Sequence, residues 1–449
     1  MILHAKTALL ANGWAENVRI TVAEGRIVEI GTEAKTGALG CLLPAPVNLH
    51  SHCFQRAMAG MTEGRSAGQD SFWTWRSLMY RFLDHLTPED VQAIAALAMV
   101  EMAEAGFAGL AEFHYLHHRP GGGSYADLAE MAGRIAAAAA ETGLGLTLLP
   151  VLYQQGGCDG RSLQAGQLRF GCDRDRYGAL LTGAQAALRG LPADTGLGVA
   201  PHSLRAVSRE ALAEVARMLP GGPVHLHLAE QVAEVEEVRA AYGVRPVEWL
   251  LGNVAVDARW CLIHATQMEP PETLRLAATG AVAGLCPITE ANLGDGIFDG
   301  VRWQGAGGQF GVGSDSNVLI SLRGELQMLE YSQRLQQRGR ALLAEAGRST
   351  GRVLLDSVCK AGAQAAGRQA GSIAVGQWAD LMALDAGSVV LEGHAGDGQL
   401  DAWIFAGNDG LVTDVWSAGR HLVQGGRHRA RDAVEARYRR VMADLRARL

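Results

Sequence analysis

Residues 41–52 read CLLPAPVNLHSH, an apolar run that ends in two histidines separated by one residue. Side chains alternate between the two faces of a strand, so His50 and His52 are expected on the same side. A strand that is buried on both faces reads as a nearly continuous apolar run. The stretch therefore predicts a buried parallel strand with two imidazoles at its C-terminal end.

Similar runs recur along the chain, each apolar for most of its length and polar at its C-terminal end. They are FAGLAEFHY (107–115), GLTLLPVLY (145–153), GLGVAPHS (196–203), PVHLHLAE (223–230), WCLIHAT (260–266), AVAGLCPIT (281–289) and FGVGSDS (310–316). Helical segments lie between them, and the best marked follows the N-cap candidate Thr87, has Pro88 in its first turn and runs to Gly106. This alternation predicts a (β/α)8 barrel, a fold that carries its active site at the C-terminal ends of the strands.

The two ends of the chain have a different character. Residues 1–40 include TVAEGRIVEIG, two short alternating runs around a turn at 23–26, and residues 371–427 contain further short strands with glycine turns. We therefore expect residues 1–44 and 366–430 to form a small β-sandwich domain, and residues 45–365 to form the barrel. Residues 431–449 are expected to form an amphipathic C-terminal helix that packs on the chain or on a second copy.

Composition limits the possible functions of this 449-residue chain. Apolar residues make up 48% of it, which suits a globular protein, and 40 Lys plus Arg against 47 Asp plus Glu give a net charge of −7, which disfavours nucleic acid as a partner. We expect no membrane span and no secretory signal. The seven cysteines lack a CxxC pair and suit reduced thiols, so the sequence predicts a cytoplasmic protein without disulfides.

Several of the predicted strand ends carry residues that bind metals. His50 and His52 end the first strand, His227 the fifth and His264 the sixth, and Asp315 follows the eighth. Nitrogen ligands with one carboxylate and room for a water are typical of a catalytic divalent-metal site. Of the pair in VHLHL, His227 lies nearer the strand end than His225, which is expected to be a core or supporting group. Cys53 is expected to face away from the ligands and to be structural.

Glu230 follows His227 by three residues, beyond the end of the predicted strand. A carboxylate there could carry a proton between a metal-bound water and a leaving nitrogen. The alternative is that Glu230 caps the acidic helix that follows. The offset from His227 favours a catalytic role.

The motifs LPAPVNLHSH, HLHLAE, LIHAT and GVGSDSN together resemble those of the amidohydrolase superfamily, and GSIAVGQWADLMALD resembles its small β-domain. The resemblance covers nearly the whole chain. Binuclear members take a bridging Lys or Glu from the fourth strand, whereas GLGVAPHS supplies neither. The resemblance therefore implies one divalent metal, Zn²⁺ being favoured, with His50, His52, His227 and Asp315 as its ligands. It also implies catalytic roles for Glu230, His264 and Asp315.

Longer runs, among them NLHSHCFQRAMAGMTE, APHSLRAVS and CPITEANLGDGIF, resemble the formimidoylglutamate deiminase family within that superfamily. This resemblance implies hydrolysis of N-formimino-L-glutamate to N-formyl-L-glutamate and ammonia in histidine degradation. The substrate contacts that it implies are Gln55, Arg76, Tyr115, His202 and Arg205. A dicarboxylate substrate requires cationic, preferably bidentate donors, which independently favours Arg76 and Arg205, with Arg81 as a competitor.

Other interpretations are compatible with parts of this pattern. A deaminase for a ring such as guanine would share the metal site and stack its substrate on Trp73, Trp75 or Tyr115. A catalytically dead scaffold would keep the fold alone, although the complete ligand set argues against it. Residues 154–174 form a long loop that is a candidate substrate lid, and a homodimer is the expected assembly.

Overall fold

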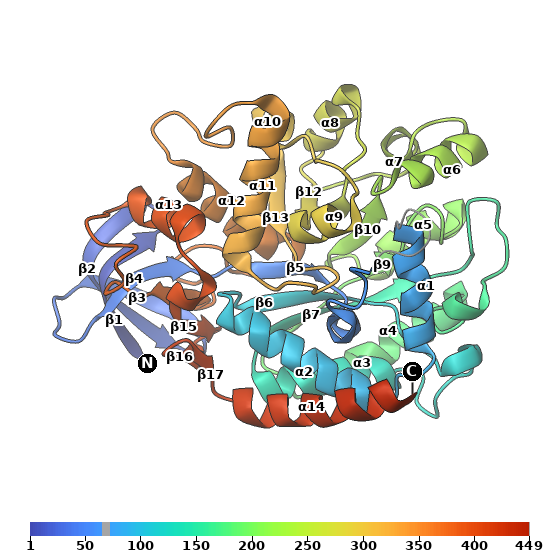
Figure 1. Ribbon diagram of the computed structural model, residues 1–449, viewed down its shortest axis with the longest axis horizontal. Coiled ribbons are helices and arrows are strands. Elements are labelled where there is room, and N and C mark those ends of the chain that lie inside the picture. The colour runs from blue at the N-terminus through green and yellow to red at the C-terminus, as the bar shows by residue number, and fades with distance from the viewer. Residues whose placement is uncertain (65–71, 449) are drawn as a thin grey trace.

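A computed structural model describes residues 1–64 and 72–448, and for residues 72–74, 76 and 77 it describes the backbone only. Its centre is a barrel of parallel strands in chain order (Figure 1). The barrel strands are β5 (Val47–Ser51), β6 (Gly109–His114), β7 (Gly145–Leu152), the short pair β8 (Gly196–Leu197) and β9 (Ala200–Pro201), β10 (Val224–Leu228), β11 (Trp260–His264), β12 (Val282–Leu285) and β13 (Gln309–Val312). Every residue of β5, β6, β7, β10, β11 and β12 is buried, as the apolar runs predict.

Backbone hydrogen bonds close this barrel at its two seams. Between β9 and β10, the N–H of His225 donates to the carbonyl of Val199 and the N–H of His227 to that of His202, both at 3.0 Å. Between β13 and β5, the N–H of Asp315 donates to the carbonyl of His50 and the N–H of His52 to that of Asp315, again at 3.0 Å. The predicted (β/α)8 barrel is confirmed, and its second seam joins three of the predicted metal ligands.

Some strand limits differ from those expected, and proline explains two of the differences. The run 41–52 divides into β4 (Leu39–Pro44), which belongs to a separate sheet, and β5, with Pro46 between them. The run 281–289 ends as a strand at Leu285 because Pro287 opens a helix. Proline lacks the N–H that a ladder requires but suits the first turn of a helix.

Helices cover the barrel, with short 3₁₀ turns among the loops. They are α1 (Phe72–Leu83), α2 (Pro88–Glu104), α3 (Glu130–Thr142), α4 (Arg174–Ala187), α5 (Arg209–Met218), α6 (Val232–Tyr242), α7 (Pro246–Asn253), α8 (Pro270–Ala277), α9 (Pro287–Leu293), α10 (Gly300–Gly305), α11 (Leu322–Gln337) and α12 (Thr350–Ala365), with turns η1 (Cys53–Met58), η2 (Pro120–Gly122), η3 (Ala165–Gln167) and η4 (Asp409–Leu411). At the start of α2, Thr87 Oγ1 accepts from the N–H of Asp90, and the Asp90 carboxylate accepts from the N–H of Thr87. This capping box fixes the helix start that the sequence predicts.

Both ends of the chain meet in one eight-stranded sheet beside the barrel (Figure 1). Its strands, in spatial order, are β17 (Arg427–His428), β16 (Arg420–Gln424), β15 (Val412–Ser417), β14 (Leu381–Leu384), β4, β1 (Ile2–Leu10), β2 (Gly13–Ala23) and β3 (Arg26–Thr32). Ile20 and Ile27 from one end of the chain pack in a single core with Leu381 and Trp416 from the other. The expected β-sandwich domain built from both termini is thus present, whereas the exact domain limits at 44, 365 and 430 stay a prediction. Helix α13 (Asp397–Ala406), which the sequence analysis did not predict, lies within the same region.

The C-terminal helix α14 (Arg431–Arg448) lies along α2 (Figure 1). Val434, Met442 and Leu445 are buried, so the chain itself covers the apolar face that could have bound a second copy. Leu449, the last residue of the predicted helix, lies outside the described residues. Among the described helices, none is both long enough and apolar enough to cross a membrane.

Candidate metal and catalytic site

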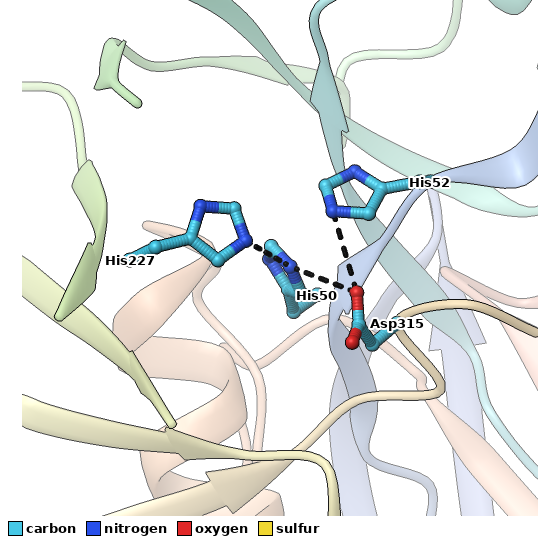
Figure 2. A group of neighbouring side chains, drawn as sticks. All are labelled: His50, His52, His227 and Asp315. Carbon is cyan, nitrogen blue, oxygen red and sulfur yellow. Dashed lines mark hydrogen bonds and ion pairs between the residues drawn. The ribbon is translucent and has the colours of Figure 1, made fainter. Parts of the chain in front are cut away.

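Four buried side chains, His50, His52, His227 and Asp315, bring one potential ligand atom each to within 4.8 Å of one another. Figure 2 shows them converging at the C-terminal ends of β5 and β10 and on the segment after β13. The Nε2 atoms of His50 and His227 are 3.1 Å apart. Asp315 Oδ1 lies 3.4 Å from Nε2 of His50 and 3.3 Å from Nε2 of His52.

The chemistry of these atoms fits a cation. His52 Nδ1 lies 3.0 Å from the carbonyl oxygen of Phe113, and His227 Nδ1 lies 3.1 Å from that of His202. A carbonyl only accepts, so each Nδ1 carries the proton and each Nε2 presents a lone pair. Burial lowers the pKa of His52 and takes those of His50 and His227 well below the usual value, which keeps the rings neutral. Lone pairs that face one another require a positive charge between them, and three imidazoles with one carboxylate suit a divalent metal.

His264 and Glu230 lie beside this cluster. His264 Nε2 is 3.8 Å from Glu230 Oε1 and 3.9 Å from Asp315 Oδ2, and His264 Nδ1 is 3.2 Å from Glu290 Oε1. Burial raises the pKa of Glu230 to about 7. Burial alone would lower the pKa of His264, but the carboxylate of Glu230 and the hydrogen bond to Glu290 raise it well above its usual value. Both groups thus have pKa values displaced upward by their surroundings, as is common for groups that handle protons at functional sites.

Glu230 does not cap the helix that follows it. The carboxylate of Glu234 accepts from the N–H of Ala229 at 3.1 Å and from the N–H of Glu230 at 3.0 Å. Instead, the Glu230 side chain lines the pocket beside the four clustered ligand residues. Glu234 thus binds backbone N–H groups that precede α6, whose N-cap Gln231 makes no side-chain capping bond, and Glu230 is free to act on a substrate.

Five non-glycine residues at this rim have left-handed backbone conformations. They are Ala229 with φ 52°, His264 with φ 68°, Ala265 with φ 50°, Asp315 with φ 42° and Asn317 with φ 56°. Residues other than glycine adopt such values at a cost that the surrounding structure must offset, and they concentrate at functional sites. The strain lies where the strands end and their side chains turn toward the cluster.

One pocket collects most of the residues predicted from sequence. It is lined by His52, Gln55, Tyr115, His202, Arg205, His227, Glu230, His264 and Asp315. Gln55 Nε2 donates to the Tyr115 hydroxyl at 2.7 Å. The side chain of Arg76 lies outside the described residues, so its position stays a prediction. Arg81 is exposed and is not among the residues that line the pocket.

Arg205 is a buried cationic residue of this pocket. Its side chain is only 11% exposed, and its closest carboxylate contact is 3.8 Å, from Nη2 to Glu234 Oε2. The buried Nε has no hydrogen-bond partner among the described residues. A buried guanidinium is stable only when paired and hydrogen-bonded. The arrangement is therefore prepared to receive an anionic group from the pocket.

Several residues of this pocket were not predicted from the sequence. They are Met79, Tyr80, Tyr153, Gly156, Arg161, Phe170, Ser203, Glu237, Leu293 and Ser316. Three of them, Gly156, Arg161 and Phe170, belong to the long loop that was a candidate lid, so the unusual length of the loop was a usable signal. Its closure over a substrate stays a prediction. Trp75, considered for ring stacking, also lines the pocket, while the Trp73 side chain lies outside the described residues.

Two residues that were expected to be structural are so placed. The Cys53 thiol lies 3.6 Å from the Ser51 hydroxyl, and Cys53 is not among the four clustered ligands. His225 Nε2 lies 2.8 Å from the carbonyl oxygen of Ala365, at the end of α12. Neither residue competes for the metal.

Comparisons with known proteins agree with this geometry. Residues 41–422 match the model of the amidohydrolase family, and residues 1–39 match that of the formimidoylglutamate deiminase HutF N-terminal domain. The chain is 46% identical to formimidoylglutamate deiminase of Pseudomonas aeruginosa over 99% of both proteins. It is 26% identical to 8-oxoguanine deaminase of the same species, over 83% of this chain and 82% of that protein.

Solved structures give the same architecture. An amidohydrolase from Brucella melitensis superimposes with a TM-score of 0.95 at 49% identity, over 99% of each chain. An adenosine deaminase from Xanthomonas campestris with bound zinc reaches a TM-score of 0.82 at 21% identity, over 99% of this chain and 98% of that one. The second likeness supports the fold alone.

Proposed function

The chain belongs to the amidohydrolase family, and we propose that it hydrolyses N-formimino-L-glutamate to N-formyl-L-glutamate and ammonia in histidine degradation. The proposal draws on the full-length similarity to formimidoylglutamate deiminase. The observation that carries it is that one pocket is lined both by His52, His227 and Asp315 of the four clustered potential ligands and by the buried, poorly paired Arg205. The first suits attack on an amidine-like carbon, and the second suits a carboxylate.

The proposed metal ligands are His50, His52, His227 and Asp315, and the proposed ion is one Zn²⁺. Three imidazoles and one carboxylate form a donor set that zinc accepts. When bound, such an ion brings the pKa of a coordinated water toward neutrality and so supplies a nucleophile.

The side chains around the cluster then divide the proton transfers. Asp315 and His264 orient the attacking water and accept its proton, since Oδ2 of the first and Nε2 of the second are 3.9 Å apart at the edge of the cluster. Glu230, whose pKa is raised to about 7, donates one proton to the imino nitrogen as the carbon is attacked. It then takes the hydroxyl proton of the tetrahedral carbon and passes it to the same nitrogen, which leaves as ammonia while the C=O bond forms. The proton held by Asp315 and His264 then returns to Glu230. His202 and Gln55 orient the formimino group.

The glutamate part of the substrate requires two anion sites. Arg205 binds one carboxylate, because its guanidinium is buried and poorly paired. Arg76 binds the other, and Tyr115 completes the contacts together with Gln55.

A deaminase for an aminated heterocycle is the second candidate. It is favoured by Trp75, Tyr115 and Phe170, whose aromatic rings line the same pocket. A neutral ring without an acceptor near Arg205 would leave its buried Nε–H without a hydrogen-bond partner, which costs free energy. The dicarboxylate therefore fits the pocket better.

We also propose a cytoplasmic homodimer without nucleic-acid or membrane partners. All seven cysteines are free and buried, which suits a reducing compartment. Because the apolar face of α14 packs against α2, the better dimer surface is on α11, where Met328, Tyr331 and Leu335 are exposed. Light scattering of the wild type beside a Leu335→Glu variant tests this assembly.

The test of function is ammonia release by the metal-loaded protein, with the product identified by mass. N-formimino-L-glutamate is compared with N-formimino-L-aspartate, guanine and cytosine. We expect rapid release from the first substrate, and an Arg205→Met variant that keeps its metal but has a strongly raised KM. No release from that substrate by fully metallated protein would refute the assignment, and release from guanine instead would support the second candidate.

A further inference from the structure

The orientation of the His264 ring depends on a residue that lies outside the pocket. His264 Nε2 faces Glu230 Oε1 and Asp315 Oδ2, whereas Nδ1 faces Glu290 Oε1 at 3.2 Å. Glu290 is 4% exposed, belongs to α9 and is not among the residues lining the pocket. Its carboxylate faces the pocket through His264, whose ring lies between them.

Glu290 is itself held in place. Its Oε1 accepts from the N–H of Cys286 at 2.9 Å, and its backbone carbonyl accepts from the N–H of Asp295 at 2.9 Å. A carboxylate oxygen that already accepts from one N–H offers only lone pairs to its second neighbour. The nitrogen that faces it, His264 Nδ1, therefore carries a proton.

This contact selects one of two ring orientations. Turning the ring over would place a carbon near Glu290 and would remove Nε2 from Glu230 and Asp315. His264 also has a left-handed backbone, with φ 68°, so its side chain leaves the strand end in a direction that the neighbouring residues must stabilise. A fixed Nδ1–H leaves Nε2 available to the reacting atoms.

We propose that Glu290 is a positioning residue that holds His264 with Nδ1 protonated and Nε2 directed at the substrate. The inference rests on the proposed function, because it concerns the same hydrolytic site. It predicts that Glu290 contributes to kcat without binding substrate or metal.

Another buried carboxylate provides a matched control. Glu325, on α11, is fully buried, and its Oε2 accepts from the N–H of Ile288 at 2.9 Å, two residues after Cys286. Both carboxylates thus bind backbone N–H groups at the start of α9, but it is Glu290 that also faces His264. Loss of either should disturb this turn, so a difference between them isolates the contact with the ring.

The experiment compares Glu290→Gln, Glu290→Met and Glu325→Met in the zinc-loaded protein. A glutamine Oε1 can still accept from both N–H groups, whereas methionine accepts from neither. We expect Glu290→Met to lower kcat about 10- to 100-fold, the usual effect of removing such a supporting partner, with KM and metal content unchanged. Glu290→Gln should restore most of kcat, and Glu325→Met should keep it within a few-fold of the wild type.

A proton NMR measurement of the hydrogen-bonded His264 ring N–H gives a readout that does not depend on turnover. The resonance should be present in wild type and Glu290→Gln, and absent or shifted in Glu290→Met. If Glu290→Met does not fold, Glu290→Asp replaces it, because the shorter side chain withdraws the acceptor and should lower kcat in the same way.

Equal kcat losses in Glu290→Met and Glu325→Met would overturn the proposal, as would a Glu290→Gln variant as slow as Glu290→Met. An unchanged ring N–H resonance in Glu290→Met would do so as well. Failure of the proposed function is distinguishable, since the wild type would then release no ammonia while the NMR comparison would still report on the ring.

Discussion

The two ends of the barrel differ in whether their buried polar and charged groups are paired within the protein. At the N-terminal end, Arg368 Nε and Nη2 bind the two oxygens of Asp380 at 2.6 and 2.8 Å, and Nη2 also lies 2.8 Å from Asp194 Oδ2. Arg420 binds both oxygens of Asp194 at 2.7 Å. At the C-terminal end, the Nε2 lone pair of His52 faces Asp315 Oδ1 at 3.3 Å, and Nε2 of His227 lies 3.1 Å from Nε2 of His50. At the N-terminal end, these charged groups are paired with one another. At the C-terminal end, they require an added cation and an anionic substrate.

We interpret the paired charges at the N-terminal end as structural and the cluster at the C-terminal end as the site of the reaction. Asp194 precedes β8, whereas Asp380 and Arg420 belong to the segments that form the small sheet, so the complete network joins the sheet to the barrel. The incomplete cluster lies at the rim where barrels carry their active sites. Changes at the first end should affect stability, and changes at the second should affect turnover.

The largest expected effect is that of metal removal. A chelator should abolish ammonia release, and added Zn²⁺ should restore it, because the cluster provides the only grouping of four such ligands found among the described residues. Thermal unfolding should also begin at a lower temperature, since lone pairs are left facing one another. Full turnover by protein shown to be metal-free would break the distinction between the two ends.

Replacement of Glu230 should give the next largest effect. Glu230→Gln removes the proton donor and should lower kcat by about two to four powers of ten, as expected of a general acid or base. Metal content, measured by elemental analysis, should not change. A variant that retains wild-type turnover would remove Glu230 from its proposed role.

At the other end, Arg368→Met should reduce stability rather than turnover. It leaves Asp380 buried without its partner, and breaking such a pair costs about 3–5 kcal/mol. Urea unfolding should show the loss, while kcat of the folded fraction stays at the wild-type value. The matched control is Arg420→Met, whose side chain is 23% exposed and should cost less. A large fall in kcat at full metal occupancy would contradict this separation.

The smallest effect concerns acid stability. Burial would raise the pKa of Asp194, but its bonds to Arg420 and Arg368 lower it below the usual value. A carboxyl whose folded pKa lies below its unfolded value of about 3.9 contributes stability above that pH and loses it as the pH falls toward the folded pKa. Unfolding free energies measured from pH 6 down to pH 3 should fall less steeply for Asp194→Asn than for the wild type. Equal slopes would show that Asp194 is not part of the titrating network.

Local patterns were sufficient for the barrel and for the grouping of candidate site residues at one rim. Apolar runs with polar ends predict parallel strands, and the ends of parallel strands meet at one rim, so His50, His227, His264 and Asp315 could be brought together before any contact was known. The hairpin turn at Glu24 and Gly25, whose φ values are 50° and 78°, could also be predicted from the local sequence.

Contacts between distant segments could not be predicted from such local patterns. Glu290 meets His264 across 26 residues, and the loop that carries Arg161 and Phe170 reaches the pocket through the folding of its own irregular backbone. That Glu234, and not Glu230, accepts from the backbone N–H groups before α6 depends on side-chain directions after the strand has ended. Periodicity predicts which residues share a face of an element. The partner of each side chain beyond that element is set by packing, by desolvation and by hydrogen bonds that form when the whole chain folds.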